Sequence, residues 1–337
     1  SLHFGLHAVE ALDARLRLSE TGPGDLAGLL AAAPGPRKYV LLNSRVHHPG
    51  HYADAARMKS LLARLDTLLA AGQLHGVVIA DAYFLKALGR AGPAVAAELE
   101  AVPSVNAMLD SAERVRAWLP AVAAAGFRPP GKLNLDRSLN RDIPRLQRVG
   151  EACRDMLPGA RLVLLANEGC IPHCPYKPAH DAHIALANMG AAEQRTFELN
   201  RCFGCVDHLM HDPSQCLCSP IIRPEDAHHY EGLADGLKVC GRTLAGPERL
   251  RRIVDAYLQG RFEGNLLELA DSMDWLAERW DLPNEKLPDD FWERVCGCQG
   301  ECGECGWRRR VFDAVARPRK AGLADLRTRR RREAFSR

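Results

Sequence analysis

Short apolar runs alternate with amphipathic stretches over most of the chain. The stretches repeat apolar residues at three- and four-residue spacing, which is typical of helices that pack on a sheet. Alternating strands and helices predict a mostly parallel sheet. The expected strands are 38–43, 76–81, 102–108, 132–136, 162–167 and 236–240, and the clearest expected helices are 55–71, 111–125, 143–156, 250–259 and 265–280.

Polar residues stand at the carboxyl ends of many of these runs, among them Asn43, Asp81, Asn106, Asp136 and Asn167. A barrel gathers such residues around one mouth, whereas an open sheet uses mainly those at its switch point. No Gly-x-Gly-x-x-Gly follows the first strands, so a dinucleotide-binding fold has no positive support. We therefore expect an α/β fold: a TIM-like (β/α) barrel with a C-terminal Cys-rich extension.

The pattern changes towards the carboxyl end, and three parts are expected. Residues 1–270 form the barrel, 271–306 a helical linker and a Cys/Gly-rich knot, and 307–337 a flexible basic tail. From Arg317 on there are nine Lys and Arg against two Asp and Glu. Such a tail can hold RNA through its phosphates. No aromatic residue stands among the arginines from 317 to 332 to stack bases, and Phe335 is the single aromatic of the tail, so a solubilising tail is the preferred interpretation.

The composition is that of a globular protein, with 47% hydrophobic and 26% charged residues in 337. No window of the length needed to cross a bilayer is free of charge, and the first residues lack the charged and apolar regions of a signal peptide. We expect a cytoplasmic protein without membrane insertion.

The chain has 12 cysteines, all after residue 152. Reducing compartments keep thiols reduced, so these cysteines are better explained as metal ligands than as disulfides. Gly and Pro flank the first pair and let a loop curl around a bound centre. The pairs Cys170/Cys174 and Cys202/Cys205 supply the four thiolates of an iron–sulfur cluster, most simply 4Fe-4S, or of zinc. Buried thiols are the alternative, and Cys240 competes with Cys205 as fourth ligand.

A second group of thiols lies near the end of the chain and is interleaved with glycines. So little apolar surface is available there that ligation of a metal is the natural way to order the segment. The alternative is a reducible knot without metal. The group consists of Cys296, Cys298, Cys302 and Cys305.

Other polar residues are candidates for substrate chemistry. Glu168 and Asn167 stand beside the first thiols and are acid/base candidates, although capping of the turn explains them equally well. His180 is a further catalytic candidate. The positive charges of Lys177, Arg223 and Arg242 suit an anionic substrate, with surface salt bridges as the alternative; Asn43, at a strand end, completes the expected substrate-binding set. His47, His48 and His51 form a cluster whose polar surroundings favour a solvated loop over a metal site.

Several motifs together resemble the collagenase-like peptidase family of unassigned catalytic type. They are Asn167-Glu168-Gly169-Cys170 with Cys174-Pro175 and His180, Ser219-Pro220-Ile221-Ile222-Arg223-Pro224-Glu225-Asp226, Lys238-Val239-Cys240-Gly241-Arg242-Thr243 and Arg261-Phe262-Glu263-Gly264-Asn265-Leu266-Leu267. With Leu41-Leu42-Asn43 and Ser138-Leu139-Asn140-Arg141-Asp142, the resemblance covers most of residues 38–270.

The resemblance implies a TIM-like barrel that carries a four-cysteine iron–sulfur cluster. Several members of the family look like oxygen-independent hydroxylation proteins that act on ubiquinone precursors or RNA bases. We therefore expect an oxidoreductase: an oxygen-independent hydroxylase or related redox-modifying enzyme that acts on a small aromatic/isoprenoid-type or RNA-borne substrate. The alternatives are a peptidase, although no Gly-x-Ser-x-Gly or His-Glu-x-x-His is present, and a metal-stabilised partner subunit. A protein partner or electron donor is also expected.

Overall fold

The computed structural model describes residues 1–337 apart from 7–11, 15–24, 194, 242–246, 299–304 and 320–337. The chain divides into two units. Unit 1 comprises Ser1–Asp136, Glu151–Leu162 and Lys177–Thr196; unit 2 comprises Arg137–Gly150, Val163–Tyr176 and Phe197–Arg337.

Four parallel strands form the sheet of unit 1. Their order is β1-β2-β3-β4, and the pairs Val40↔Val77 and Val77↔Ala101 give the register at the centre. Every residue of β2, β3 and β4 is buried, as expected for continuous apolar runs covered on both faces. The strands are β1 (Leu2–Phe4), β2 (Lys38–Leu42), β3 (Gly76–Ile79) and β4 (Glu100–Pro103), and β5 (Lys132–Asn134) follows in the same unit.

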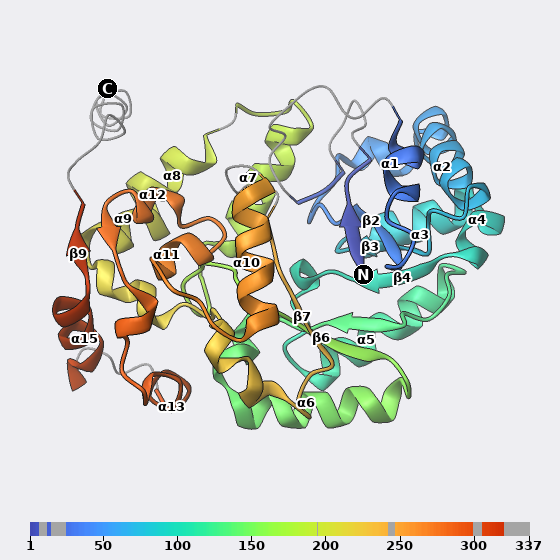
Figure 1. Ribbon diagram of the computed structural model, residues 1–337. Coiled ribbons are helices and arrows are strands. Elements are labelled where there is room, and N and C mark those ends of the chain that lie inside the picture. Colours follow the sequence, from blue (N-terminus) through green and yellow to red (C-terminus); the bar gives the residue numbers. More distant parts are fainter. Residues whose placement is uncertain (7–11, 15–24, 194, 242–246, 299–304, 320–337) are drawn as a thin grey trace. The chain divides into compact units, whose positions relative to one another are not determined.

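Helices of unit 1 pack on this sheet, and the longest of them buries an apolar stripe. Helix α2 buries Met58, Leu61, Leu65 and Leu68, and Figure 1 shows α2 and α3 beside the blue and cyan strands. At Gly89 of α3 an added Cβ would lie 1.9 Å from the Ala125 carbonyl oxygen, so only glycine permits this close approach. The helices are α1 (Leu26–Ala31), α2 (Ala55–Ala70), α3 (Ala82–Ala91), α4 (Pro93–Glu98), α5 (Ala112–Ala124) and α7 (Lys177–Asn188), with the short turns η1 (Pro49–Tyr52) and η2 (Val105–Ala107).

Helix α6 (Ile143–Met156) and strand β6 (Arg161–Leu165) contribute residues to both units. In unit 2, β6 pairs in parallel with β7 (Gly236–Lys238), with Leu165 opposite Lys238. Short helices and turns make up most of the remainder. They are η3 (Arg137–Arg141), α8 (Thr196–Phe203), α9 (Cys205–His211), η4 (Pro213–Cys218), η5 (Pro224–Tyr230), α10 (Pro247–Gln259), α11 (Leu266–Leu269), α12 (Asp274–Ala277), η6 (Asn284–Lys286), α13 (Phe291–Cys296) and α15 (Trp307–Val315).

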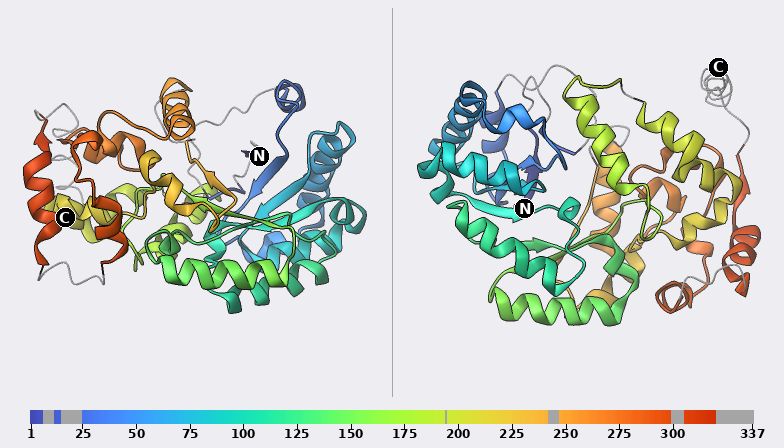
Figure 2. Two further views of the ribbon diagram at one scale, coloured as in Figure 1. Left: turned by 60° about the horizontal axis from the view of Figure 1, so that its bottom comes forward. Right: turned by 180° about the vertical axis from the view of Figure 1, so that it is seen from behind.

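The carboxyl-terminal helix α15 belongs to the core of unit 2. It buries Val311, Phe312 and Val315, and it packs on η4, as Figure 2 shows for the red helix. Arg308 fixes the contact by donating hydrogen bonds to Ser214 Oγ (3.1 Å) and Asp212 Oδ2 (2.7 Å). Residues 307–319 are therefore ordered, in contrast to the flexible tail expected from residue 307; the segment from 320 lies outside the described residues.

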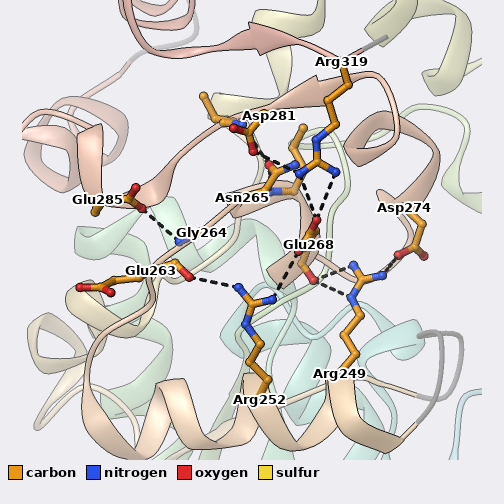
Figure 3. Close-up of polar contacts among 12 residues, drawn as sticks. Arg249, Arg252, Glu263, Gly264, Asn265, Glu268, Asp274, Asp281, Glu285 and Arg319 are labelled. Carbon is orange, nitrogen blue, oxygen red and sulfur yellow. Dashed lines mark hydrogen bonds and ion pairs between the residues drawn. The ribbon is translucent and has the colours of Figure 1, made fainter. Parts of the chain in front are cut away.

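Ion pairs hold the last described strand in place (Figure 3). β9 (Arg317–Pro318) pairs antiparallel with β8 (Trp280–Asp281). The next residue, Arg319, lies 3.3 Å from Glu268 Oε1 and 3.2 Å from Asp281 Oδ1. Arg249 binds the Glu268 carbonyl from the other side. Because these side chains are partly exposed, each ion pair contributes little stability, and the hydrophobic core carries most of the packing.

Five of the six predicted strands and the long predicted helices other than 265–280 are confirmed to within a few residues. The strand predicted over 102–108 is wrong in its second half, because β4 ends at Pro103 and η2 follows it. The pairs β1–β2, β2–β3, β3–β4 and β6–β7 are parallel, whereas β8 and β9 are antiparallel. Closure into one barrel stays a prediction. A single helix over 265–280 is wrong: α11 and α12 are separated by Ser272, whose φ of +71° interrupts the helical path. No helix within the described ranges is long and apolar enough to cross a membrane.

Candidate functional site

Polar side chains gather where β2 and β4 end in unit 1. We call Asn43, Arg45, Ser104, Asn106, Lys177 and Asp181 the strand-end cluster. Asn43 Nδ2 donates to Ser104 Oγ (3.1 Å), Asn43 Oδ1 accepts from the Ala14 amide (3.2 Å), and Asn106 Nδ2 donates to the Asn43 carbonyl (3.4 Å). Asn43 was expected to bind substrate. Both of its polar side-chain atoms have protein partners, which position Asn43 between β2 and β4, and its substrate role stays a prediction.

Lys177 lies at the start of α7 and meets a carboxylate one turn later. Its Nζ donates to both oxygens of Asp181 at 2.5 Å and to Asn106 Oδ1 at 3.3 Å. Arg45 approaches Asp181 from the loop after β2, with Nη1 3.3 Å from Oδ2. Lys177 was predicted to bind substrate, whereas Asp181 and Arg45 were not among the predicted site residues. The spacing of Lys177 and Asp181, four residues apart on a helix, is the signal that could have found the pair.

Unit 1 also contains a buried carboxylate, Asp81, that contacts the imidazole of His47, two residues after Arg45. Asp81 begins α3 and accepts hydrogen bonds from the amides of Tyr83 (2.9 Å) and Phe84 (3.2 Å). Its other oxygen lies 2.6 Å from Tyr52 Oη and 2.9 Å from His47 Nδ1. Burial opposes ionisation of Asp81, but the hydrogen bonds from His47, Tyr52 and the helix amide together lower its pKa.

His47 is 6% exposed and stacks on Phe84 with ring centroids 4.1 Å apart. The expectation of a solvated histidine loop is therefore wrong for His47, because its ring is held by a carboxylate and an aromatic face. It holds for His48, which is exposed.

The loop after β6 in unit 2 is anchored through its backbone. We call residues 167–174 the thiol loop. Asn167 is completely buried; its Nδ2 donates to the carbonyls of Cys240 (2.8 Å) and Leu269 (3.2 Å), and its Oδ1 accepts from the Cys240 amide (2.7 Å). The Asn167 carbonyl also accepts from the Asp271 amide. Asn167 thus fixes the start of the loop against two other segments.

Glu168, the first acid/base candidate, forms an ion pair with Arg137. The Arg137 and Glu168 side chains are only 8% and 15% exposed, so the ion pair compensates two largely buried charges. The Glu168 carbonyl accepts from Ser219 Oγ at 3.3 Å. Arg137 is a site residue that the sequence analysis overlooks, because nothing in its local pattern shows which carboxylate it meets.

The predicted thiol ligands all lie in unit 2. Cys202 is on α8, Cys205 begins α9, and Cys240 follows β7. Burial and the neighbouring Cys170 raise the pKa of the Cys205 thiol to about 11, so Cys170 and Cys205 are close enough to interact. Within the described ranges, however, no group of three or more His, Cys, Asp or Glu side chains is arranged to hold a metal ion. The four-thiolate centre stays a prediction.

The C-terminal thiols are only partly described. Cys298 and Cys305 are exposed, whereas Cys296, at the end of α13, is half-buried. Burial raises the pKa of Cys296, against the influence of the nearby Arg141 guanidinium. Cys302 lies outside the described residues, so the second metal site also stays a prediction.

The remaining predicted site residues are Arg223, His180 and Arg242. Arg223 is 7% exposed and forms two hydrogen bonds with Asp226 (2.7 and 2.6 Å). Its guanidinium also lies over Phe291, 4.5 Å from the ring centroid, so its charge is already paired. His180 is on α7 in unit 1 and is half-buried. Arg242 lies outside the described residues.

A surface groove of about 1150 Å³ runs between α2 and α3 in unit 1. Tyr52, Met58, Leu62 and Tyr83 line it. The residues that line this groove include no member of the strand-end cluster and none of the site residues predicted from the sequence.

The chain is similar to a protein of known sequence and to a solved structure. Over 220 residues the chain is 28% identical to the uncharacterized protease MJ1657 of Methanocaldococcus jannaschii, a match that covers 64% of this chain and 60% of that protein. The chain thus spans less than two thirds of its relative. The solved structure of the U32 peptidase Mk0906 aligns with a TM-score of 0.46 and 17% identity, over 72% of this chain and 85% of that one. No family model matches.

Proposed function

We propose that this chain is an enzyme of the collagenase-like peptidase family and that it cleaves peptide bonds. The observation that carries the proposal is the 28% identity over 220 residues to a protein named as a protease. It agrees with the alternative expected from the sequence motifs better than with hydroxylation.

The thiol loop is the proposed reaction centre. Asn167 fixes the backbone, and the Arg137 guanidinium holds the carboxylate of Glu168 in an ion pair. Glu168 is then suited to orient a water molecule or a substrate N–H group. Cys170, two residues further on, is the proposed nucleophile of this loop.

Cleavage of denatured collagen or casein tests the proposal. Glu168→Ala and Cys170→Ala should each abolish cleavage, whereas Cys153→Ala, which changes a buried thiol of α6, should retain it. Cleavage no greater than that of a mock preparation, or cleavage that survives both loop substitutions, contradicts the proposal.

A second candidate function is oxygen-independent hydroxylation supported by an iron–sulfur cluster. The proximity of Cys170 and Cys205 favours it, and Cys174, Cys202 and Cys240 are in the same unit. Thiolates are the usual ligands of such clusters, which supply one-electron redox chemistry when bound. The described residues nevertheless do not assemble a four-ligand site. This candidate therefore rests on the chemistry of the thiols and on one close pair.

Anaerobic purification separates the two candidates. The second predicts iron and sulfide in the protein, with an optical and EPR signal that Cys170→Ala or Cys205→Ala removes and Cys153→Ala keeps. A colourless protein that takes up no iron or sulfide on anaerobic reconstitution contradicts it and leaves the peptidase assay as the deciding measurement.

A further inference from the structure

Two cations share one carboxylate in the strand-end cluster. Arg45 and Lys177 both pair with Asp181, at 3.3 and 2.5 Å. In the described part of the chain, neither cation pairs with another carboxylate. The remaining contacts of Lys177 and Arg45 are with neutral groups, namely Asn106 Oδ1 at 3.3 Å and Met108 Sδ at 3.1 Å. The three charges therefore sum to one positive charge.

This positive charge is poorly exposed to water. The side chains of Lys177, Asp181 and Arg45 are 13%, 6% and 24% exposed. An uncompensated charge at such a position is costly, because little water reaches it and the surrounding dielectric constant is low. An anion bound beside Arg45 and Lys177 would balance the charge and accept their charge-assisted hydrogen bonds.

Two buried acceptors near the same strand ends also have no hydrogen-bond partner among the described residues. Asn134 is 2% exposed; its Nδ2 donates to the Pro103 carbonyl at the end of β4, but its Oδ1 has no donor. His47, two residues after Arg45, likewise has an unpaired Nε2. Since the ionised Asp81 can only accept, His47 Nδ1 donates to it, and in the neutral form of the ring Nε2 carries a lone pair. Both atoms require a donor.

We infer that the strand-end cluster of unit 1 is a binding site for a small oxyanion, a carboxylate or phosphate, that also carries a hydroxyl or amino hydrogen-bond donor. Arg45 and Lys177 bind the oxyanion, while Asp181 and Asn106 hold Lys177 in place. The unpaired acceptors Asn134 Oδ1 and His47 Nε2 select ligands with donors. The inference goes beyond the proposed function, because this binding does not depend on which reaction the enzyme performs.

Equilibrium binding to the whole chain tests the inference, with inorganic phosphate, acetate and glycolate as probes at constant ionic strength. Calorimetry or ligand-dependent thermal unfolding gives the dissociation constants. Phosphate and glycolate should bind, and glycolate should bind more tightly than acetate because only glycolate adds a hydroxyl donor. Arg45→Gln and Lys177→Gln should each weaken binding about tenfold, in line with the loss of one charge-assisted hydrogen bond.

Asp181→Asn should act in the opposite direction and tighten binding, because it removes the carboxylate that competes for the two cations. Lys59→Gln, which removes an exposed cation on α2, is the control and should leave binding unchanged. If wild-type protein binds none of the probes, or if Arg45→Gln, Lys177→Gln and Lys59→Gln bind them equally well, the inference is overturned. If glycolate and acetate bind with equal affinity, the inference that the ligand carries a hydrogen-bond donor is overturned. Circular dichroism establishes that each variant is folded, and the assay needs no peptidase activity.

Discussion

The strand-end cluster of unit 1 and the thiol loop of unit 2 both follow the carboxyl ends of parallel strands, but they satisfy their polar groups differently. In the cluster, charged side chains pair mainly with one another, and one positive charge is left over. In the thiol loop, the side chain of Asn167 bonds to backbone groups, and Glu168 forms an ion pair with Arg137. The net positive charge of the strand-end cluster can bind an anionic ligand, whereas the hydrogen bonds of Asn167 fix the backbone that carries the thiols.

Asn167→Ala should have the largest effect of the substitutions that test this difference. It leaves the Cys240 amide and the Leu269 carbonyl without their partner, and each unsatisfied buried group costs roughly 1–3 kcal/mol. We expect the free energy of unfolding to fall by about 3 kcal/mol, measured by urea denaturation. Asn188→Ala, which loses one hydrogen bond to Asp13, is the matched control. Equal losses in both variants would show that Asn167 has no special role.

Arg137→Ala should cause the second largest loss in the free energy of unfolding. It removes the Arg137 guanidinium from the largely buried carboxylate of Glu168, and we expect the free energy of unfolding to fall by about 2 kcal/mol. Adding Glu168→Gln should recover part of this loss, because the buried charge of Glu168 is then removed. The exposed pair Arg294 and Asp290 provides the comparison, and Arg294→Ala should cost less than about 0.5 kcal/mol. A double variant no more stable than Arg137→Ala would contradict this account of Glu168.

Asp181→Asn breaks the other region and should cost about 1 kcal/mol, since Arg45 and Lys177 then repel each other without a carboxylate between them. Phosphate should restore stability to this variant more than to wild type, measured as the increase in Tm with phosphate concentration. Asp66→Asn, which changes an exposed residue of α2, should show no such difference. If phosphate raises the Tm of wild type, Asp181→Asn and Asp66→Asn by the same amount, Asp181 has no influence on anion binding.

The smallest effect concerns Cys205, whose pKa is about 11 in the folded chain against an ordinary value of 9.0. Between these values the unfolded chain loses the proton first, so the contribution of this thiol to stability is complete below pH 9 and is lost as the pH rises towards 11. Alkylation of Cys205 by iodoacetamide, followed by peptide mass spectrometry, should therefore keep accelerating above pH 9. A rate that levels off near pH 9 would show an unperturbed thiol.

Local pattern was sufficient to predict most of the regular structure. The apolar runs that became β2, β3 and β6 are continuous, and the stripe of Met58, Leu61, Leu65 and Leu68 has helical spacing. The same reasoning failed over 265–280, because apolar residues at helical spacing do not reveal the left-handed backbone at Ser272.

The site residues were predicted less completely, because their roles depend on partners far away in the chain. Asn167 was identified from its position after a strand, yet its bonds reach Cys240 and Leu269. The pairing of Arg223 with Asp226 lies within one turn, so it was within reach of a sequence pattern, whereas the substrate role of Arg223 stays a prediction. Nothing in the sequence connects Arg45 to Asp181 or Arg137 to Glu168.

The carboxylate of Asp81 caps the amino end of α3 and also orients the ring of His47. The first turn of the helix and the tautomer of the imidazole are therefore thermodynamically linked. When α3 frays at its amino end, the amides of Tyr83 and Phe84 exchange with solvent, and the same opening event frees the ring of His47 to reorient. Hydrogen exchange at these two amides consequently reports how often His47 loses its orientation.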